Sequence, residues 1–118
     1  MGKSSQRKGA AGERELAAIL RQYGYNMQRG GFVFGDVPDL VGLPGIHIEV
    51  KRVEKLNLVE AMGQALRDSE KFRDGMPAVF HRRNKKAENG VTSRWMVTMF
   101  FDDWIEIYNN SDYPDNRG

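Results

Sequence analysis

Residues 38–51 read PDLVGLPGIHIEVK, and this stretch decides the fold that we predict for the 118-residue chain. Asp39–Leu43 is a short apolar run, Pro44–Gly45 is a turn signal, and Ile46–Arg52 alternates in polarity. Within that last run, alternate residues point to opposite faces of a strand. The apolar face carries Ile46, Ile48 and Val50, and the polar face carries His47, Glu49 and Lys51. We therefore expect two neighbouring strands joined by a tight turn.

Helices are expected on both sides of this stretch. Residues 11–23 repeat apolar side chains with a helical period, and Gly24 is placed to end that helix. Asn57 is a candidate cap of a second helix that runs to Phe72, with Glu60 as its capping-box partner. Shorter elements complete the chain: strands at 25–29, 77–81 and 94–100, and a last helix to Tyr108 capped by Asp102 or Asp103.

This order of elements predicts an α/β sandwich, in which a central mixed sheet is flanked by helices. Since domains commonly span about 100–200 residues, we expect residues 1–118 to form a single domain. The two ends, residues 1–8 and 110–118, lack an apolar period and are expected to be flexible.

The composition excludes several kinds of site. The chain has no cysteine, which removes disulfides, thiolate zinc sites, iron–sulfur clusters and cysteine nucleophiles. No apolar run approaches the roughly 18 residues of a membrane span. We expect an intracellular, cytoplasmic protein with no membrane partner.

Charge is unevenly distributed along the chain, although the net charge is only +2. Residues 1–35 carry six basic and two acidic side chains, and residues 81–94 carry five and one. Residues 102–118 carry five acidic side chains and one arginine. Two basic segments and an acidic tail suit a polyanion such as DNA, although an ordinary solvated surface has the same composition. Within the second basic segment, a run of cations could flank a DNA groove: Arg82, Arg83, Lys85 and Lys86.

The predicted strand pair brings three ionisable side chains close together. Glu49 and Lys51 lie two residues apart and share a face, and Asp39 begins the neighbouring strand. Two converging carboxylates repel each other unless a positive charge lies between them. Mg²⁺ suits that position because it takes oxygen ligands and retains several waters. Asp39 and Glu49 are therefore candidate metal ligands, and the carbonyl of Val50 is a further one.

Lys51 then has two plausible roles in the hydrolysis of a phosphate ester. Its ammonium can orient or help to deprotonate the attacking water, and it can stabilise charge that builds on the phosphate. The alternatives are structural: Asp39 as a turn residue after Pro38, and Glu49 and Lys51 on a solvated sheet face. His47 shares that face, but a lone histidine is more often a satisfied neutral residue.

With these residues identified, the chain resembles the PD-(D/E)xK nuclease superfamily and its restriction-endonuclease-like fold. Within that superfamily it looks most like the archaeal-type Holliday junction resolvases and small phage-encoded endonucleases. The likeness spans roughly residues 7–80. It is carried by Pro38, Asp39, Glu49 and Lys51, and by Lys8-Gly9, Glu13-Arg14-Glu15-Leu16, Gly24-Tyr25 and Arg29.

The resemblance implies a three-layer sandwich and an Mg²⁺-dependent DNA endonuclease, with Mn²⁺ as a substitute ion. It assigns Glu13 as a further metal ligand and Gln64 as a catalytic residue, although either could be a solvent-facing helix residue. It also assigns phosphate contacts to Lys8, Arg14 and Arg29. Because a Holliday junction has two-fold symmetry, we expect a homodimer, with the aromatic segment Trp95–Trp104 as a candidate surface.

Two other functions fit the sequence. A nuclease of the same fold that cuts nicked, flap or duplex DNA would use the same active residues. A non-catalytic module that binds nucleic acid would not need converging carboxylates, so the set Asp39, Glu49 and Lys51 argues against it. A Gly-rich nucleotide-binding loop is absent from the sequence.

Overall fold

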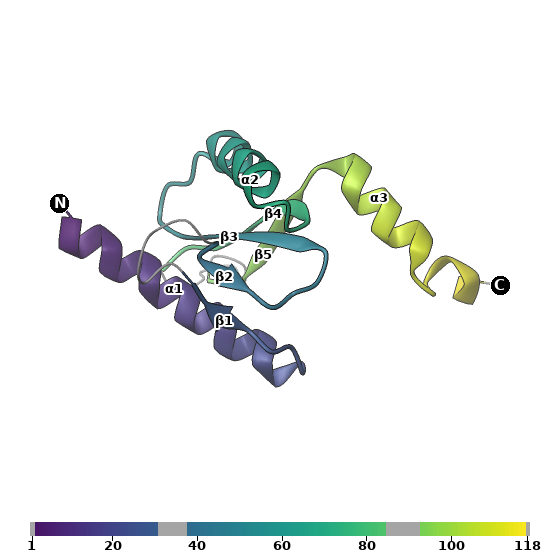
Figure 1. The fold of residues 1–118 in the computed structure, drawn as a ribbon, viewed down its shortest axis with the longest axis horizontal. Coiled ribbons are helices and arrows are strands. Elements are labelled where there is room, and N and C mark those ends of the chain that lie inside the picture. Colours follow the sequence, from purple (N-terminus) through teal and green to yellow (C-terminus); the bar gives the residue numbers. More distant parts are fainter. Residues whose placement is uncertain (1, 31–37, 85–92, 118) are drawn as a thin grey trace.

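A computed structural model describes residues 2–30, 38–84 and 93–117, with side chains for 10–30, 38–84 and 93–115 (Figure 1). The elements are α1 (Gly2–Gln22), β1 (Gln28–Arg29), β2 (Leu40–Val41), β3 (Ile46–Arg52), α2 (Leu58–Phe72), β4 (Met76–Arg82), β5 (Met96–Met99), α3 (Phe101–Asn110) and η1 (Pro114–Arg117). The predicted order of helices and strands is confirmed. The first helix begins at Gly2 rather than at residue 11, and η1 follows α3 within the segment predicted to be irregular.

The central sheet is mixed, as predicted. Its strand order is β3-β4-β5, with β3 parallel to β4 and β4 antiparallel to β5. A parallel pair needs a crossover connection, and α2 supplies it between β3 and β4. Figure 1 shows α2 on one side of β3 and α1 on the other, so the α/β sandwich is confirmed.

The alternation of β3 and β4 divides the core between the two helices. Ile48, Ala78 and Phe80 pack with Leu16 and Ala17 of α1. On the opposite face, Val79 packs with Ala61, Met62 and Ala65 of α2. His47 and Glu49 alternate with Ile48 along β3 and therefore lie on the α2 face, where both are buried. Two ionisable side chains of the sheet are therefore buried beneath α2.

The predicted hairpin between residues 39–43 and 46–52 is wrong. β2 pairs with β1 in a separate antiparallel ribbon, with Arg29 opposite Leu40. Gly42 explains the difference, because its φ of +129° turns the chain out of the strand conformation. A Cβ at Gly42 would lie 2.5 Å from the carbonyl oxygen of Asn26, so this close approach requires glycine. β2 still lies beside β3, and Asp39 is the residue directly before β2.

The two predicted helix caps have opposite outcomes. The Oδ1 of Asn57 accepts a hydrogen bond from the backbone N–H of Glu60 at 3.1 Å, which confirms the cap of α2. The prediction that Asp102 or Asp103 caps α3 is wrong, because its N-cap is Phe100 and no side chain completes the cap. The two aspartates lie in the first turn instead, where their negative charge interacts favourably with the helix dipole.

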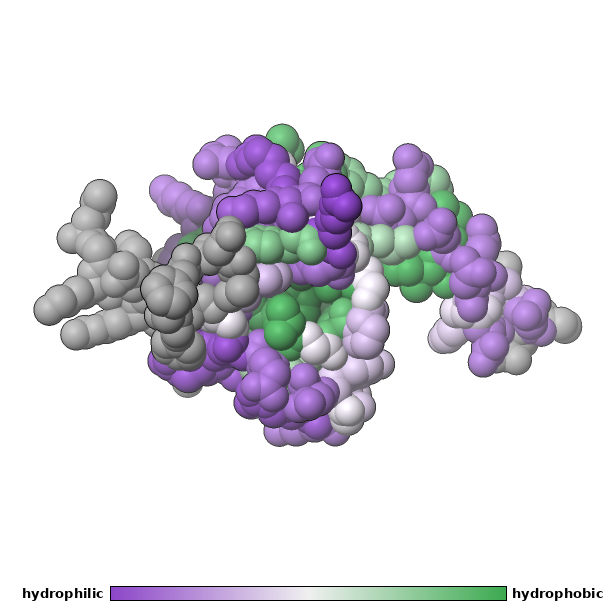
Figure 2. Space-filling model, viewed as in Figure 1, coloured by the Kyte–Doolittle hydropathy of each residue, from purple (hydrophilic) through white to green (hydrophobic). Residues whose placement is uncertain are grey.

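The helix α3 extends away from the sandwich in Figure 1. It carries large apolar side chains in solvent: Phe101 is 69% exposed, Trp104 47% and Ile107 41%. Figure 2 shows apolar surface over the first turns of this helix. Among the described helices, none combines the length and the apolar character needed to cross a membrane.

Candidate active site

Three of the residues expected at the site meet on the α2 face of the sheet. Glu49 and Lys51 project from β3, and Gln64 projects from α2 above them. The Nζ of Lys51 lies 3.5 Å from Oε2 of Glu49 and donates a hydrogen bond to Oε1 of Gln64 at 3.3 Å. The lysine ammonium is therefore held between a strand carboxylate and a helix amide.

A polar cavity of about 230 Å³ opens beside this group. Pro38 and Asp39 contribute to its wall from the chain before β2, Glu49 from β3, and Gln64 and Asp68 from α2. Both residues of the Pro38-Asp39 motif therefore reach the same cavity as Glu49, although the two strands do not form a hairpin.

The electrostatics show that carboxylates from three elements converge. Burial raises the pKa of Glu49 above its usual value of 4.5; Lys51 lowers it, and the charges of Asp39 and Asp68 raise it. Burial also raises the pKa of Glu13 on α1, and the charge of Asp39 is the next largest cause. The charge of Asp39 therefore raises the pKa of both glutamates.

Glu13 has its own counter-charge. Its Oε1 accepts hydrogen bonds from Nε and Nη2 of Arg29, each at 3.3 Å. This contact lowers the pKa of Glu13 against the effects of burial and Asp39. Arg29, which was expected to contact phosphates, is therefore engaged with a carboxylate of the site.

The other predicted phosphate contacts differ in their surroundings. Arg14 is exposed on α1, and Arg83 is exposed with its Nε 3.8 Å from Glu54. Arg82 lies in β4 rather than in the expected loop, and its guanidinium binds both oxygens of Glu15 at 2.7 and 3.0 Å. The side chain of Lys8, together with Lys85 and Lys86, lies outside the described residues.

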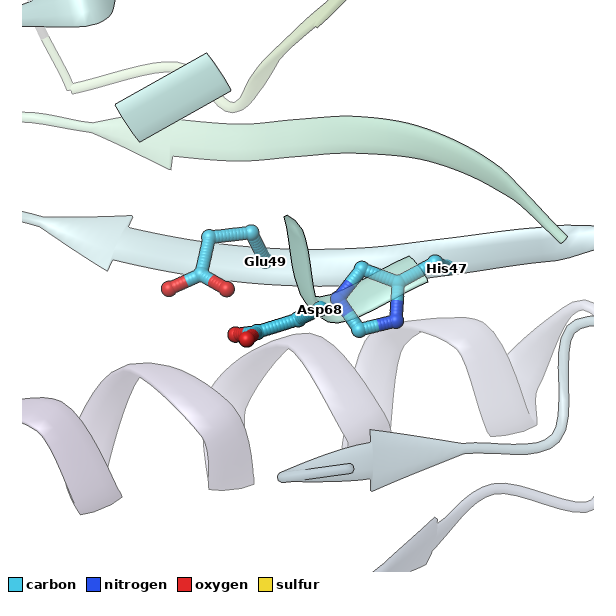
Figure 3. Close-up of side chains that lie close together, drawn as sticks. All are labelled: His47, Glu49 and Asp68. Carbon is cyan, nitrogen blue, oxygen red and sulfur yellow. The ribbon is translucent and has the colours of Figure 1, made fainter. Parts of the chain in front are cut away.

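Sequence reasoning missed two residues of the site. His47 was treated as a satisfied neutral histidine, and Asp68 was not considered. The structure places both beside Glu49, with one ligand atom of each of the three residues within 4.8 Å of the others (Figure 3). A signal for Asp68 exists, because it follows Gln64 by four residues and so shares its side of the helix.

This arrangement suits a hard divalent cation. Asp39 and Glu49 line one cavity, and carboxylate oxygens are the ligands that Mg²⁺ prefers. A cation there would offset the burial and the neighbouring negative charges that raise the pKa of Glu49. The carbonyl of Val50 lies on β3 between Glu49 and Lys51. A cation, an ammonium and a polar cavity at one sheet edge are the components needed to hydrolyse a phosphate ester.

Comparison with known proteins gives a family match. The model of the archaeal Holliday junction resolvase family matches residues 4–85, which is more than half of the chain. No curated protein and no solved structure matches the chain. The matched segment includes Glu13, Asp39, Glu49 and Lys51, and it ends before β5 and α3.

The raised pKa values predict how stability changes with pH in metal-free buffer. Glu13 and Glu49 bind their protons more tightly in the folded state, so their contribution is fully present below the ordinary pKa of 4.5. It is lost as the pH rises through the raised folded-state values. The melting temperature measured by circular dichroism should therefore fall over this range, and Glu49→Gln should reduce the fall.

Mg²⁺ added at neutral pH should recover the lost stability, by about 2.7 kcal/mol at 100 times its Kd. A Glu49→Gln variant should gain less from the same addition. Identical pH profiles for the wild type and the variant, with no effect of Mg²⁺ on either, would contradict the electrostatic account of the site.

Proposed function

Because the chain belongs to the archaeal Holliday junction resolvase family, and is therefore an endodeoxyribonuclease that resolves DNA junctions, we propose that it works through the carboxylate and lysine group around Glu49. In this proposal Glu13, Asp39 and Glu49, with the carbonyl of Val50, hold Mg²⁺, for which Mn²⁺ can substitute. Lys51 is the catalytic cation. Since the substrate is DNA, we place the activity in the cytoplasm.

The observation that carries this proposal is that Asp39 and Glu49 line one polar cavity, beside which Nζ of Lys51 lies 3.5 Å from Oε2 of Glu49. The charge of Asp39 also raises the pKa of Glu49 on β3 and of Glu13 on α1. A structural salt-bridge network would instead pair each carboxylate with a cation. Among the described residues, Arg29 pairs with Glu13 and Lys51 pairs with Glu49, whereas no cation forms an ion pair with Asp39.

When bound, the divalent ion supplies Lewis-acid stabilisation of the scissile phosphate and activates water. The chain's own contribution is the placement of Lys51. Its Nζ, fixed by Glu49 and Gln64, can orient the attacking water and stabilise the charge that builds on the phosphate as the P–O bond breaks. Gln64 therefore acts through Lys51 as a positioning residue.

The proposed DNA contacts fall into two groups. Arg14 and Arg83 are exposed, and we expect them to contact phosphates, as we do for Lys8, Lys85 and Lys86. Arg29 and Arg82 are held by Glu13 and Glu15. We infer that these two arginines mainly stabilise the fold around the site, and that the phosphate contacts belong to the first group.

A direct test compares the cleavage of a synthetic Holliday junction, a flap and a linear duplex in Mg²⁺. The junction should be cut preferentially. Lys51→Ala should lose about 10²–10⁴-fold in rate while retaining junction binding in a gel shift, because the lysine acts on the reaction rather than on affinity. Glu70→Gln, which changes an exposed glutamate on α2, is the matched control and should retain full activity.

Two outcomes would contradict this proposal. Equal rates on all three DNAs would remove the selectivity for junctions. Normal cleavage by Lys51→Ala would remove the assigned role of the lysine, even if the junction remained the preferred substrate.

We further propose that the enzyme is a homodimer. A two-fold symmetric junction that is cut in two places suits a symmetric enzyme. The expected surface, residues 95–104, includes exposed Val97 and Phe100, and the apolar side chains of α3 continue it. Phe101 and Trp104 are one helical turn apart and share a side of α3. An apolar helix that extends from the body suits burial against a second copy.

Sedimentation velocity tests this interface. The wild type should sediment as a dimer, and Trp104→Glu should shift it to a monomer, because a charge would be buried at the centre of the contact. Asn109→Glu adds the same charge to α3 at an exposed polar position and should leave the dimer intact. A monomeric wild type, or a dimeric Trp104→Glu variant, would place the interface elsewhere or exclude it.

A further inference from the structure

A second group of potential ligands lies next to the proposed magnesium site. His47 and Glu49 project from β3 on the same face, and Asp68 faces them from α2. His47 is 2% exposed and Glu49 is 7% exposed, so two of the three are buried. Figure 3 shows the imidazole and the two carboxylates close together. One ligand atom of each residue lies within 4.8 Å of the others. Ligands about 2.0–2.2 Å from a shared ion are separated by distances within this limit.

The histidine has one nitrogen satisfied and one that is not. Its Nδ1 lies 2.9 and 2.8 Å from the two carboxylate oxygens of Asp74. Since an ionised carboxylate only accepts hydrogen bonds, Nδ1 is the donor, and Nε2 of the neutral ring then carries the lone pair. Nε2 is buried and has no hydrogen-bond partner among the described residues. In Figure 3 this nitrogen, the one farther from the backbone, is on the side of Asp68 and Glu49.

The surroundings of His47 are those of a metal ligand. A histidine that binds a metal through one nitrogen commonly donates the other N–H to a carboxylate, which fixes the tautomer and the ring orientation. Asp74 provides that carboxylate from the turn after α2. Phe72 stacks on the imidazole with ring centroids 6.3 Å apart and planes at 16°, which further restricts the ring. A buried acceptor that is held in place but unpaired is costly unless a ligand completes it.

We propose that Nε2 of His47, with the carboxylates of Glu49 and Asp68, binds a divalent transition-metal ion at a second site. An imidazole among the donors favours a transition metal such as Zn²⁺ over Mg²⁺, and Mn²⁺, which accepts the two carboxylates, serves as the paramagnetic probe. Glu49 belongs to both proposed sites, and Asp39, His47 and Asp68 line the same cavity. A contribution of this ion to catalysis rests on the proposed function, whereas the binding site itself rests only on the geometry of these side chains.

Pulsed electron paramagnetic resonance of the full chain with Mn²⁺ alone, without DNA, tests the site. An imidazole nitrogen bonded to Mn²⁺ produces a ¹⁴N modulation that carboxylates and water do not. The chain has two histidines, His47 and His81. The wild type and the His81→Gln control should show the modulation, and His47→Gln should lose it. No modulation in the wild type, or its persistence in His47→Gln, would overturn the proposal.

A second variant covers the case in which the buried His47→Gln does not fold, which circular dichroism would reveal. Asp68 is only partly buried, and Asp68→Asn preserves its size. This variant should weaken the ¹⁴N-coupled Mn²⁺ binding at least 10-fold; unchanged binding would overturn the proposal.

Asp39→Asn separates the two sites. Asp39 belongs only to the proposed magnesium site, so this variant should retain the ¹⁴N signal. Loss of the signal in Asp39→Asn would show that Asp39 and His47 belong to a single metal site, and would overturn the inference of a second site. Failure of junction cleavage in a wild type that shows the signal would instead count against the proposed function.

Discussion

The structure around the site depends on one constraint: Glu49 is buried among other negative charges. The glutamate is 7% exposed, burial raises its pKa, and Asp39 and Asp68 raise it further, while Lys51 is the cation that opposes them. Burying a carboxylate in this way costs free energy unless it is compensated. The residues around Glu49 are arranged as if that compensation comes from a bound cation, and the chemistry of a phosphodiesterase follows from the same arrangement.

Three parts of the fold create this arrangement: the crossover helix α2, the ribbon of β1 and β2, and the helix α1. The crossover helix α2 carries Gln64 and Asp68 over the polar face of β3, because a parallel β3–β4 pair needs a connection of that length. The ribbon of β1 and β2 brings Asp39 to the edge of β3 and Arg29 to α1. The helix α1 packs on the opposite face of the sheet, and the charge of Asp39 raises the pKa of its Glu13. The family match over residues 4–85 includes these three parts of the fold, and α3 lies outside the matched segment.

The features that the sequence predicted correctly are those set by local periodicity. The alternation of residues 46–52 placed Glu49 and Lys51 on one face, and the cap of Asn57 with Glu60 placed the start of α2. The features it could not predict depend on contacts between distant residues. The pairing of β2 with β1 follows from the conformation of Gly42 and its contact with Asn26, which a turn signal at Pro44–Gly45 does not encode. The contact of His47 with Asp74 spans 27 residues, and that of Arg82 with Glu15 spans 67. The roles of these side chains were therefore open until the fold was known.

The central claim is that a divalent cation binds among the carboxylates of Glu13, Asp39 and Glu49. The most direct measurement is an anomalous difference map from a crystal of the protein soaked in Mn²⁺. The account predicts a peak between Asp39 and Glu49, with carboxylate oxygens at about 2.0–2.2 Å, in the cavity beside Lys51. A map without a peak at that position, with the carboxylates of Asp39 and Glu49 turned apart into solvent, would contradict it.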